Sequence, residues 1–360
     1  MSRIISIVIL FAALWQGGAT FGQDRGWAAA IAWRPDGEMI AIGSSTGVWL
    51  FDSEFKELGY VHVRHKWDLP PRSLSWNTAG DLLAVGYMQL GRAPIQIIDI
   101  AKLEVISEIS TRFPEWTPIE WHPRDDLIVV GTYDGTAHIF DAITGEEQFY
   151  FVERKEKVRG ALSNYTVGFC WFDEDILVIA THHEVYVVDI ASKELLQTTD
   201  PDTVFDTTDC NRERQLITTN GKLYDIGTGS LIDFFTEHDL YINRIILTLD
   251  VAWSPAGRRF VASTEGCLVR VFDGRTGETL AVLSGGIHYE QQAHSFFLSS
   301  IAWHPDGGQF AVVGQFGDIR VWDVKTYELQ RRFDGFEPIN AVDGVPYKTR
   351  EESLEYECPE

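Results

Sequence analysis

Histidine offers the most varied chemistry in this sequence, because its imidazole titrates near neutral pH and binds metals. Seven of the ten histidines fall between apolar runs: His62, His65, His182, His183, His238, His288 and His294. Converging segments could bring three imidazoles together with Asp239, Glu184 or Glu290 in a metal or acid/base site. No HxH or HExxH spacing fixes such a geometry, and polar loops ordinarily carry exposed histidines. The sequence therefore predicts no metal site and no cofactor.

Aromatic and basic side chains mark the same segments as binding candidates. Trp67 and Tyr289 are anchors of the kind enriched at binding hot spots. A basic cluster, Arg154, Lys155, Lys157 and Arg159, stands out in an acidic chain and would meet either an acidic partner or the chain's own carboxylates. The candidate partner-binding residues are His65, Trp67, Arg154, Lys155, His183, His238, His288 and Tyr289.

Sequence motifs of catalysis are missing. There is no GxSxG, no Gly-rich phosphate loop and no coupled Ser/His/Asp pattern. The acidic run from Asp200 to Asp209 lacks the spacing and distal Glu of a calcium loop. The four cysteines, Cys170, Cys210, Cys267 and Cys358, form no CxxC and allow three pairings. Because a core of this size needs no cross-link, buried free thiols are expected.

One repeated pattern organises the chain from residue 27 onward. In each unit an alternating apolar stretch ends in Trp before a turn, at Trp33, Trp76, Trp121, Trp171, Trp253 and Trp303, and Cys210 takes this place in one further unit. A short apolar strand follows, and a third strand ends on Asp, at Asp52, Asp99, Asp141, Asp189, Asp225, Asp273 and Asp323. Period-2 runs of β-branched and aromatic residues between turns predict strands.

Four short strands make a sheet too small to bury both of its faces alone. Arranged radially, such sheets cover one another and leave only short edges. Seven units therefore predict an all-β protein, a seven-bladed propeller with four antiparallel strands per blade.

These units resemble the WD40 repeat over roughly residues 27–335. Asp323 in VWD matches the family's WD dipeptide, whereas other units replace its Trp, and the family's Gly-His dipeptide is missing. Of the aspartates that this dipeptide normally meets, Asp134 and Asp318 remain. The resemblance implies that packing carries more of the stability. The segment 328–333 supplies the last outer strand, so we expect contiguous blades and closure by side-chain packing.

The resemblance also implies two unlike faces. With strands named a to d outward from the axis, the a–b and c–d turns share one face, and the b–c and d–a links share the other, the top face. Insertions fall at 62–72, 110–117, 152–165, 236–247 and 284–296 in d–a links, and at 87–94 in a b–c link. Because binding residues concentrate on variable loops of rigid scaffolds, we expect a partner to bind the top face.

Residues 1–22 are typical of a secretory signal peptide. Arg3 precedes an apolar run that is shorter than a membrane span, and cleavage after Ala19 or Gly22 suits the small residues there. The expected organisation is a signal peptide (1–22), a propeller (23–335) and an acidic C-terminal tail (336–360). The mature protein is expected outside the cytoplasm, secreted or in the cell envelope.

The net charge of −23 disfavours nucleic acid and anionic lipid surfaces as partners. The leading prediction is a monomeric, non-catalytic scaffold that binds a protein or peptide on its top face, with no direct membrane binding after signal removal. One alternative is a propeller-type hydrolase or lyase with histidines and carboxylates at the channel mouth. Another is a structural component of the cell envelope.

Overall fold

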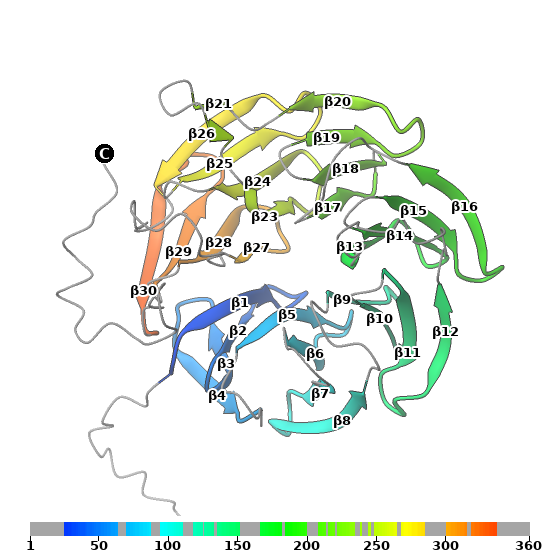
Figure 1. The fold of residues 1–360 in the computed structure, drawn as a ribbon. Coiled ribbons are helices and arrows are strands. Elements are labelled where there is room, and N and C mark those ends of the chain that lie inside the picture. The colour runs from blue at the N-terminus through cyan, green and yellow to red at the C-terminus, as the bar shows by residue number, and fades with distance from the viewer. Residues whose placement is uncertain are drawn as a thin grey trace, which may run out of the picture.

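The computed structural model describes residues 25–63, 70–87, 94–110, 118–124, 126–132, 135–151, 166–181, 184–199, 208–213, 215–219, 222–234, 238–239, 244–245, 248–264, 268–284, 300–314 and 318–336. In this part of the chain seven four-stranded antiparallel sheets stand around a common axis (Figure 1). The predicted seven-bladed propeller is confirmed.

Each blade is one uninterrupted stretch of sequence, as expected. The first three blades comprise β1 (Ala28–Trp33), β2 (Met39–Ser44), β3 (Gly47–Asp52) and β4 (Glu57–Val61); β5 (Pro71–Trp76), β6 (Leu82–Tyr87), β7 (Pro94–Asp99) and β8 (Glu104–Ser110); β9 (Ile119–Trp121), β10 (Leu127–Gly131), β11 (Ala137–Asp141) and β12 (Glu147–Phe151). Blades 4 and 5 comprise β13 (Thr166–Trp171), β14 (Ile176–Thr181), β15 (Val185–Asp189) and β16 (Glu194–Thr199); β17 (Thr208–Asn211), β18 (Leu216–Thr219), β19 (Lys222–Asp225) and β20 (Leu231–Phe234).

Blades 6 and 7 comprise β23 (Thr248–Trp253), β24 (Arg259–Thr264), β25 (Leu268–Asp273) and β26 (Thr279–Ser284); β27 (Ser300–Trp303), β28 (Gln309–Val313), β29 (Asp318–Asp323) and β30 (Leu329–Asp334). Between blades 5 and 6 the chain forms a small hairpin of β21 (His238–Asp239) and β22 (Arg244–Ile245). No helix in the described residues is long and apolar enough to cross a membrane.

The hydrophobic core is divided among the seven junctions between neighbouring blades. Each of seven buried clusters draws its residues from two consecutive blades. Between blades 1 and 2, for example, Leu50 packs with Trp76 and Leu83. Because every sheet buries its apolar faces only against its neighbours, the closed ring is the unit of stability.

In three blades the Trp that ends the innermost strand is hydrogen-bonded to the preceding blade through its indole N–H. Trp76 Nε1 donates to the carbonyl of Ala32 at 3.3 Å, and Trp303 Nε1 donates to the carbonyl of Ala252 at 2.9 Å. In blade 6, Trp253 Nε1 donates to Thr218 Oγ1 at 3.1 Å. The repeated Trp is therefore a staple between blades as well as a core residue.

The seven aspartates that end the third strands act as turn caps. In every blade the Asp Oδ1 accepts backbone N–H bonds from the c–d turn; Asp273, for instance, accepts from Arg275 at 2.8 Å and Thr276 at 2.9 Å. Such local bonds are the usual reason for Asp at a turn. They lower the pKa of Asp141 and Asp323.

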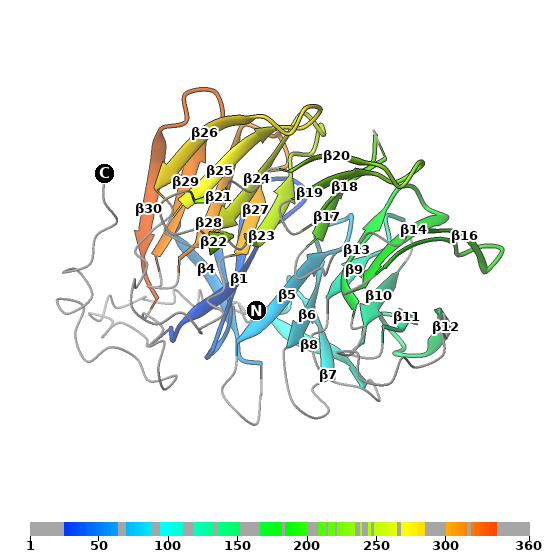
Figure 2. The same ribbon diagram turned by 45° about the horizontal axis from the view of Figure 1, so that its top comes forward.

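Blades 7 and 1 close the ring without sharing a strand, as the sequence predicted (Figures 1 and 2). Phe333 stacks on Phe55 at 5.1 Å and meets Phe51 edge-on at 5.1 Å. The guanidinium of Arg25 lies 5.1 Å from the Trp49 ring, and Arg25 also pairs with Glu57 at 2.8 Å. The junction between blades 7 and 1 is therefore a cluster of aromatic rings with the Arg25 guanidinium beside it.

Asp318 departs from the expectation based on the WD40 resemblance. Its Oδ2 accepts from Arg320 Nε at 2.8 Å, and its side chain is 4% exposed. A neighbouring Arg on the same strand therefore partners this carboxylate. Asp134, the other aspartate in question, lies outside the described residues.

Candidate functional site

The structure does not describe the side chains that the sequence predicts to bind a partner. His65, Trp67, Arg154, Lys155, His183, His288 and Tyr289 belong to links that it does not describe. His238 begins β21 and pairs with Ile245 of β22, but its side chain is likewise not described. These eight residues therefore remain predictions from the sequence.

The strand bounds nevertheless show which face carries the long links. The a–b and c–d links span four or five residues in every blade. The d–a links are longer, from residues 111–118 and 200–207 up to 152–165 and 285–299. In an antiparallel meander the d–a and b–c links leave from the same edge, so the strand ends that flank all of these long links point to the top face. The strand ends that flank residue 183, in the b–c link of blade 4, point to the same face.

A second set of chemical groups lies on the innermost strands, toward the opposite face. The residue before the Trp, or before Cys210 in blade 5, is Ala32, Ser75, Glu120, Cys170, Asp209, Ala252 or Ala302. Two blades thus place a carboxylate where most others have a small side chain. Because this position is one step from the a–b turn, both carboxylates lie toward the short-turn face.

Asp209 joins blades 5 and 6. Its Oδ2 accepts the backbone N–H of Trp253 at 2.7 Å, and its Oδ1 accepts that of Cys210 at 2.7 Å. Ser75 makes the same inter-blade contact, accepting the backbone N–H of Trp121 at 3.0 Å. Burial raises the pKa of Asp209 to about 6, although these N–H donors and the Arg212 cation oppose the shift.

Glu120 reaches across blade 4 toward blade 5. Its Oε1 lies 3.6 Å from Arg212 Nη2, and about a third of its side chain, 36%, is exposed. Burial raises the pKa of Glu120 to about 7; Arg212 opposes the shift, and the Asp209 charge adds to it. We define Glu120, Asp209 and Arg212 as the axial triad, in which the pKa values of both carboxyl groups are raised toward neutral pH.

This triad was not predicted from the sequence. A signal was present, since Glu120 and Asp209 interrupt a column of small residues beside the repeated Trp. Within the described residues no group of three or more His, Cys, Asp or Glu side chains could hold a metal ion. Two carboxyl groups beside one Arg support a structural ion cluster more directly than a catalytic centre.

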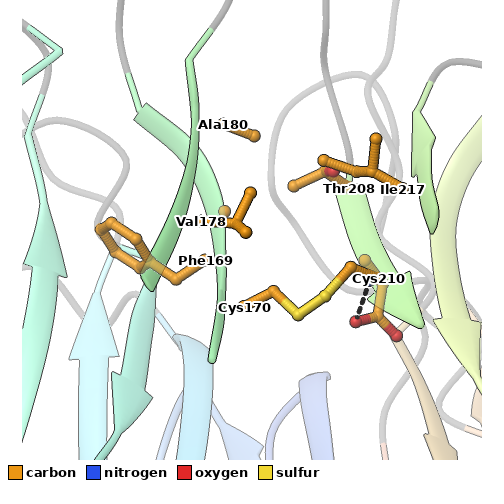
Figure 3. A pocket seen from close by; sticks show the side chains of 9 residues that line it. Phe169, Cys170, Val178, Ala180, Thr208, Cys210 and Ile217 are labelled. Carbon is orange, nitrogen blue, oxygen red and sulfur yellow. Dashed lines mark hydrogen bonds between the residues drawn. A yellow bond between two sulfur atoms is a disulfide. The ribbon is translucent and has the colours of Figure 1, made fainter. Parts of the chain in front are cut away.

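The cysteines differ from the expectation of buried free thiols. Cys170 of blade 4 and Cys210 of blade 5 form a disulfide, with their Cα atoms 6.0 Å apart, so the expectation of free thiols was wrong for this pair (Figure 3). The bond joins the innermost strands β13 and β17. Cys267 and Cys358 lie outside the described residues.

The histidines beside the repeated Trp residues are structural. His122 Nε2 bonds the carbonyl of Glu174 at 2.7 Å, and its ring meets Trp171 edge-on at 4.7 Å. His304 does the same at the ring closure, where it bonds the carbonyl of Gly37 at 3.2 Å and meets Trp33 at 4.7 Å. Each imidazole links its blade to the next one.

Comparison with known proteins agrees with this architecture. The ring of seven four-stranded blades defines the class, the β-propellers. The β-propeller domain of Myceliophteria thermophila Cps50 (Swd1) superposes with a TM-score of 0.69 over 83% of this chain and 98% of that one, at 16% identity. At that identity the likeness establishes the fold alone.

Parts of the chain are similar to a known repeat family. Residues 119–141 and 285–323 match the family model "WD domain, G-beta repeat". Chicken WD repeat-containing protein 1 is 32% identical over 99 residues, and the Schizosaccharomyces pombe target of rapamycin complex subunit wat1 is 26% identical over 102 residues. These segments are 28% of this chain but 14% and 28% of the relatives, so the chain matches less than a third of either. This protein is a seven-bladed β-propeller, and parts of its chain are similar to WD40 repeats.

Proposed function

We propose that the protein is a non-catalytic scaffold outside the cytoplasm that binds a protein or peptide on its top face. One observation carries the proposal: the seven short-turn edges are uniform, whereas every long link leaves from the opposite edge. Variation confined to one face of a rigid ring is the arrangement expected of a binding platform.

The WD40 fold supports a binding role. Propellers of this family typically serve as non-enzymatic scaffolds for protein partners. One relative is by name a subunit of a complex, the target of rapamycin complex. The strongly acidic composition favours a protein or peptide over a nucleic acid as the partner.

Two features support a location outside the cytoplasm. The first 22 residues have the charge, apolar run and small residues of a secretory signal. The disulfide between Cys170 and Cys210 is of the kind that persists in oxidising compartments and is rare in the cytosol. The mature N-terminus of exported protein, measured by mass spectrometry, checks this part of the proposal; an uncleaved Met1 on protein retained in the cytoplasm contradicts it.

A crosslinking pulldown from the native exported fraction tests the binding face. Replacing residues 152–165 or 285–299 by short Gly-Ser links should reduce partner recovery at least tenfold while the blades stay folded. The matched control changes the short-turn face, by R275A and E278A in a c–d turn, and should recover the partner normally. Equal recovery from trimmed and control proteins would remove the top face from consideration.

Point variants then separate the candidate anchors. Removing the aromatic rings with W67A and Y289A should weaken binding without a change in salt dependence. Removing the charges with R154A and K155A should weaken it chiefly at low ionic strength, because exposed charges are screened by salt. Binding to the captured partner is measured by biolayer interferometry. Binding equal to that of the wild type in both double variants would count against these residues.

A further inference from the structure

Six of the seven junctions between blades contain a Trp from the following blade. These are Trp33, Trp76, Trp121, Trp171, Trp253 and Trp303, each lying in the buried cluster that it shares with the preceding blade. The junction between blades 4 and 5 has Cys210 at this position. The largest side chain of the repeat is therefore missing at this one junction.

The disulfide partner also occupies a defined place in the repeat. Cys170 takes the position before the Trp, where other blades carry Ala32, Ala252 and Ala302. At two other junctions the Trp ring reaches the backbone at this position, since Trp76 Nε1 donates to the Ala32 carbonyl and Trp303 Nε1 to the Ala252 carbonyl. The disulfide (Figure 3) thus joins the same two positions of the repeat that the indole hydrogen bond joins at those two junctions.

A bridge of two sulfurs occupies less volume than an indole ring. Beside it lies a pocket of about 140 Å³ that is partly open to solvent, is lined by residues such as Val178, Ala180 and Ile217, and is too narrow to hold a water molecule. Gly168 partly compensates by letting the blades approach, since a Cβ there would lie 2.4 Å from Thr208 Cγ2. Packing at this junction is consequently less complete than a Trp would make it.

Blade 5 is also the smallest blade. Its strands β17 to β20 are four residues each, whereas those of blade 6 are six residues each. Shorter strands bury less apolar surface against a neighbour. A blade with little surface and no staple depends on the cross-link to stay in the ring.

We propose that the Cys170–Cys210 disulfide is a redox-dependent lock that replaces the missing Trp, so that its reduction opens the ring between blades 4 and 5. The chemistry is a two-electron exchange with a dithiol reductant. The S–S bond breaks, each cysteine takes up one proton and one electron, and the reductant closes to its own disulfide. The proposal is independent of which partner the top face binds.

Burial of the sulfurs adds a kinetic consequence. Cys170 and Cys210 are each 6% exposed, so a reductant reaches them only when the junction opens. The native protein should therefore be reduced slowly, at the opening rate, and reduction in 3 M urea should be at least tenfold faster. By the same argument the bond forms during folding, before blades 4 and 5 close upon each other.

Hydrogen exchange of the mature chain, read by mass spectrometry before and after reduction with dithiothreitol, tests the lock. Once the intact mass confirms two new thiols, peptides within 166–199 and 208–234 should exchange at least tenfold faster, while those within 28–61 stay unchanged. Thermal unfolding should shift down by roughly 5 °C. Unchanged exchange in fully reduced protein, or a peptide map that joins Cys170 to Cys267 or Cys358, would overturn the proposal.

A matched pair of variants separates the lock from a general loss of stability. C170A/C210W restores the residues found at the other junctions and should recover the melting temperature of the oxidised protein, with no response to reductant. C170A/C210A should melt at the temperature of the reduced protein in both conditions. If C170A/C210A is as stable as the oxidised protein, the lock has no role. If the tryptophan variant does not fold, the exchange experiment alone decides.

Discussion

The position before the repeated Trp shows how one backbone site yields different outcomes from residue to residue. Ser75 and Asp209 use it to accept the N–H of the next blade's Trp, and Cys170 uses it for a covalent bond. Glu120 is longer and reaches Arg212, two blades away. The blade geometry is constant, so the side chain alone decides which neighbour is bound.

Glu120 should make the stability of the protein depend on pH. Burial raises its pKa to about 7 from an ordinary 4.5, so the folded chain holds a proton that the unfolded chain has released between these values. This stabilisation is complete below pH 4.5 and is lost as the pH rises through 7. E120Q stays neutral, and it should therefore be more stable than the wild type by about 1 kcal/mol at pH 8, after allowance for solvent screening, and equal to it at pH 4.5.

Urea unfolding at the two pH values measures this difference. The control is E194Q, which changes an exposed glutamate on the outer strand β16 and should leave the midpoint unchanged at both values. A wild-type protein that is more stable than E120Q at pH 8 would show that the Arg212 pair outweighs desolvation.

At the scale of elements, the short a–b turns are parts of the inter-blade contacts. Gly37 has a φ of +77°, and a Cβ on it would lie 2.3 Å from His304 Nε2 of blade 7. Gly145, in a c–d turn, has a similar φ of +72°, but the nearest atom to its Cβ would be 3.6 Å away. Both glycines have a left-handed backbone conformation, and they differ in how close the nearest atom would lie to an added Cβ.

Replacing each glycine by alanine separates these effects. G145A should cost about 1 kcal/mol, the strain of a left-handed alanine. G37A adds a displaced imidazole and a disturbed hydrogen bond to the Gly37 carbonyl, so it should cost about 2–3 kcal/mol. Guanidinium unfolding of both variants provides the comparison, and equal losses would mean that His304 moves aside freely.

Most of the fold could be predicted because each repeat unit can be recognised from short-range sequence patterns. The seven Trp-equivalent positions and the seven turn-capping aspartates set the number of blades, and Cys210 correctly marked the fifth one. The disulfide could not be predicted, because a sequence separation of 40 does not reveal that two adjacent positions of the repeat face each other across a junction. The axial triad was missed because it depends on groups from blades 3 and 5 meeting at the axis. The top-face residues are still known only from the sequence.

At the scale of the whole molecule, the closure between blades 7 and 1 determines whether the ring behaves as one cooperative unit. No strand is exchanged there, so side chains of the two chain ends must supply the cohesion. Phe333 is central, since it contacts Phe51, Phe55 and Phe336 and lies 5.9 Å from the Arg25 guanidinium. Arg331 adds a bond to the Ser53 carbonyl at 2.8 Å.

F333A should therefore destabilise the ring far more than its position on an outer strand suggests. The loss of a partly buried aromatic ring from this cluster should cost about 3 kcal/mol, whereas L329A on the same strand, where Leu329 is 47% exposed, should cost less than about 0.5 kcal/mol. Opening at the closure frees both chain ends together, so limited proteolysis of F333A should cut blades 1 and 7 at equal rates before any other blade. First cuts between blades 4 and 5 in oxidised F333A would instead show that the disulfide junction, and not the closure, is where this ring opens most easily.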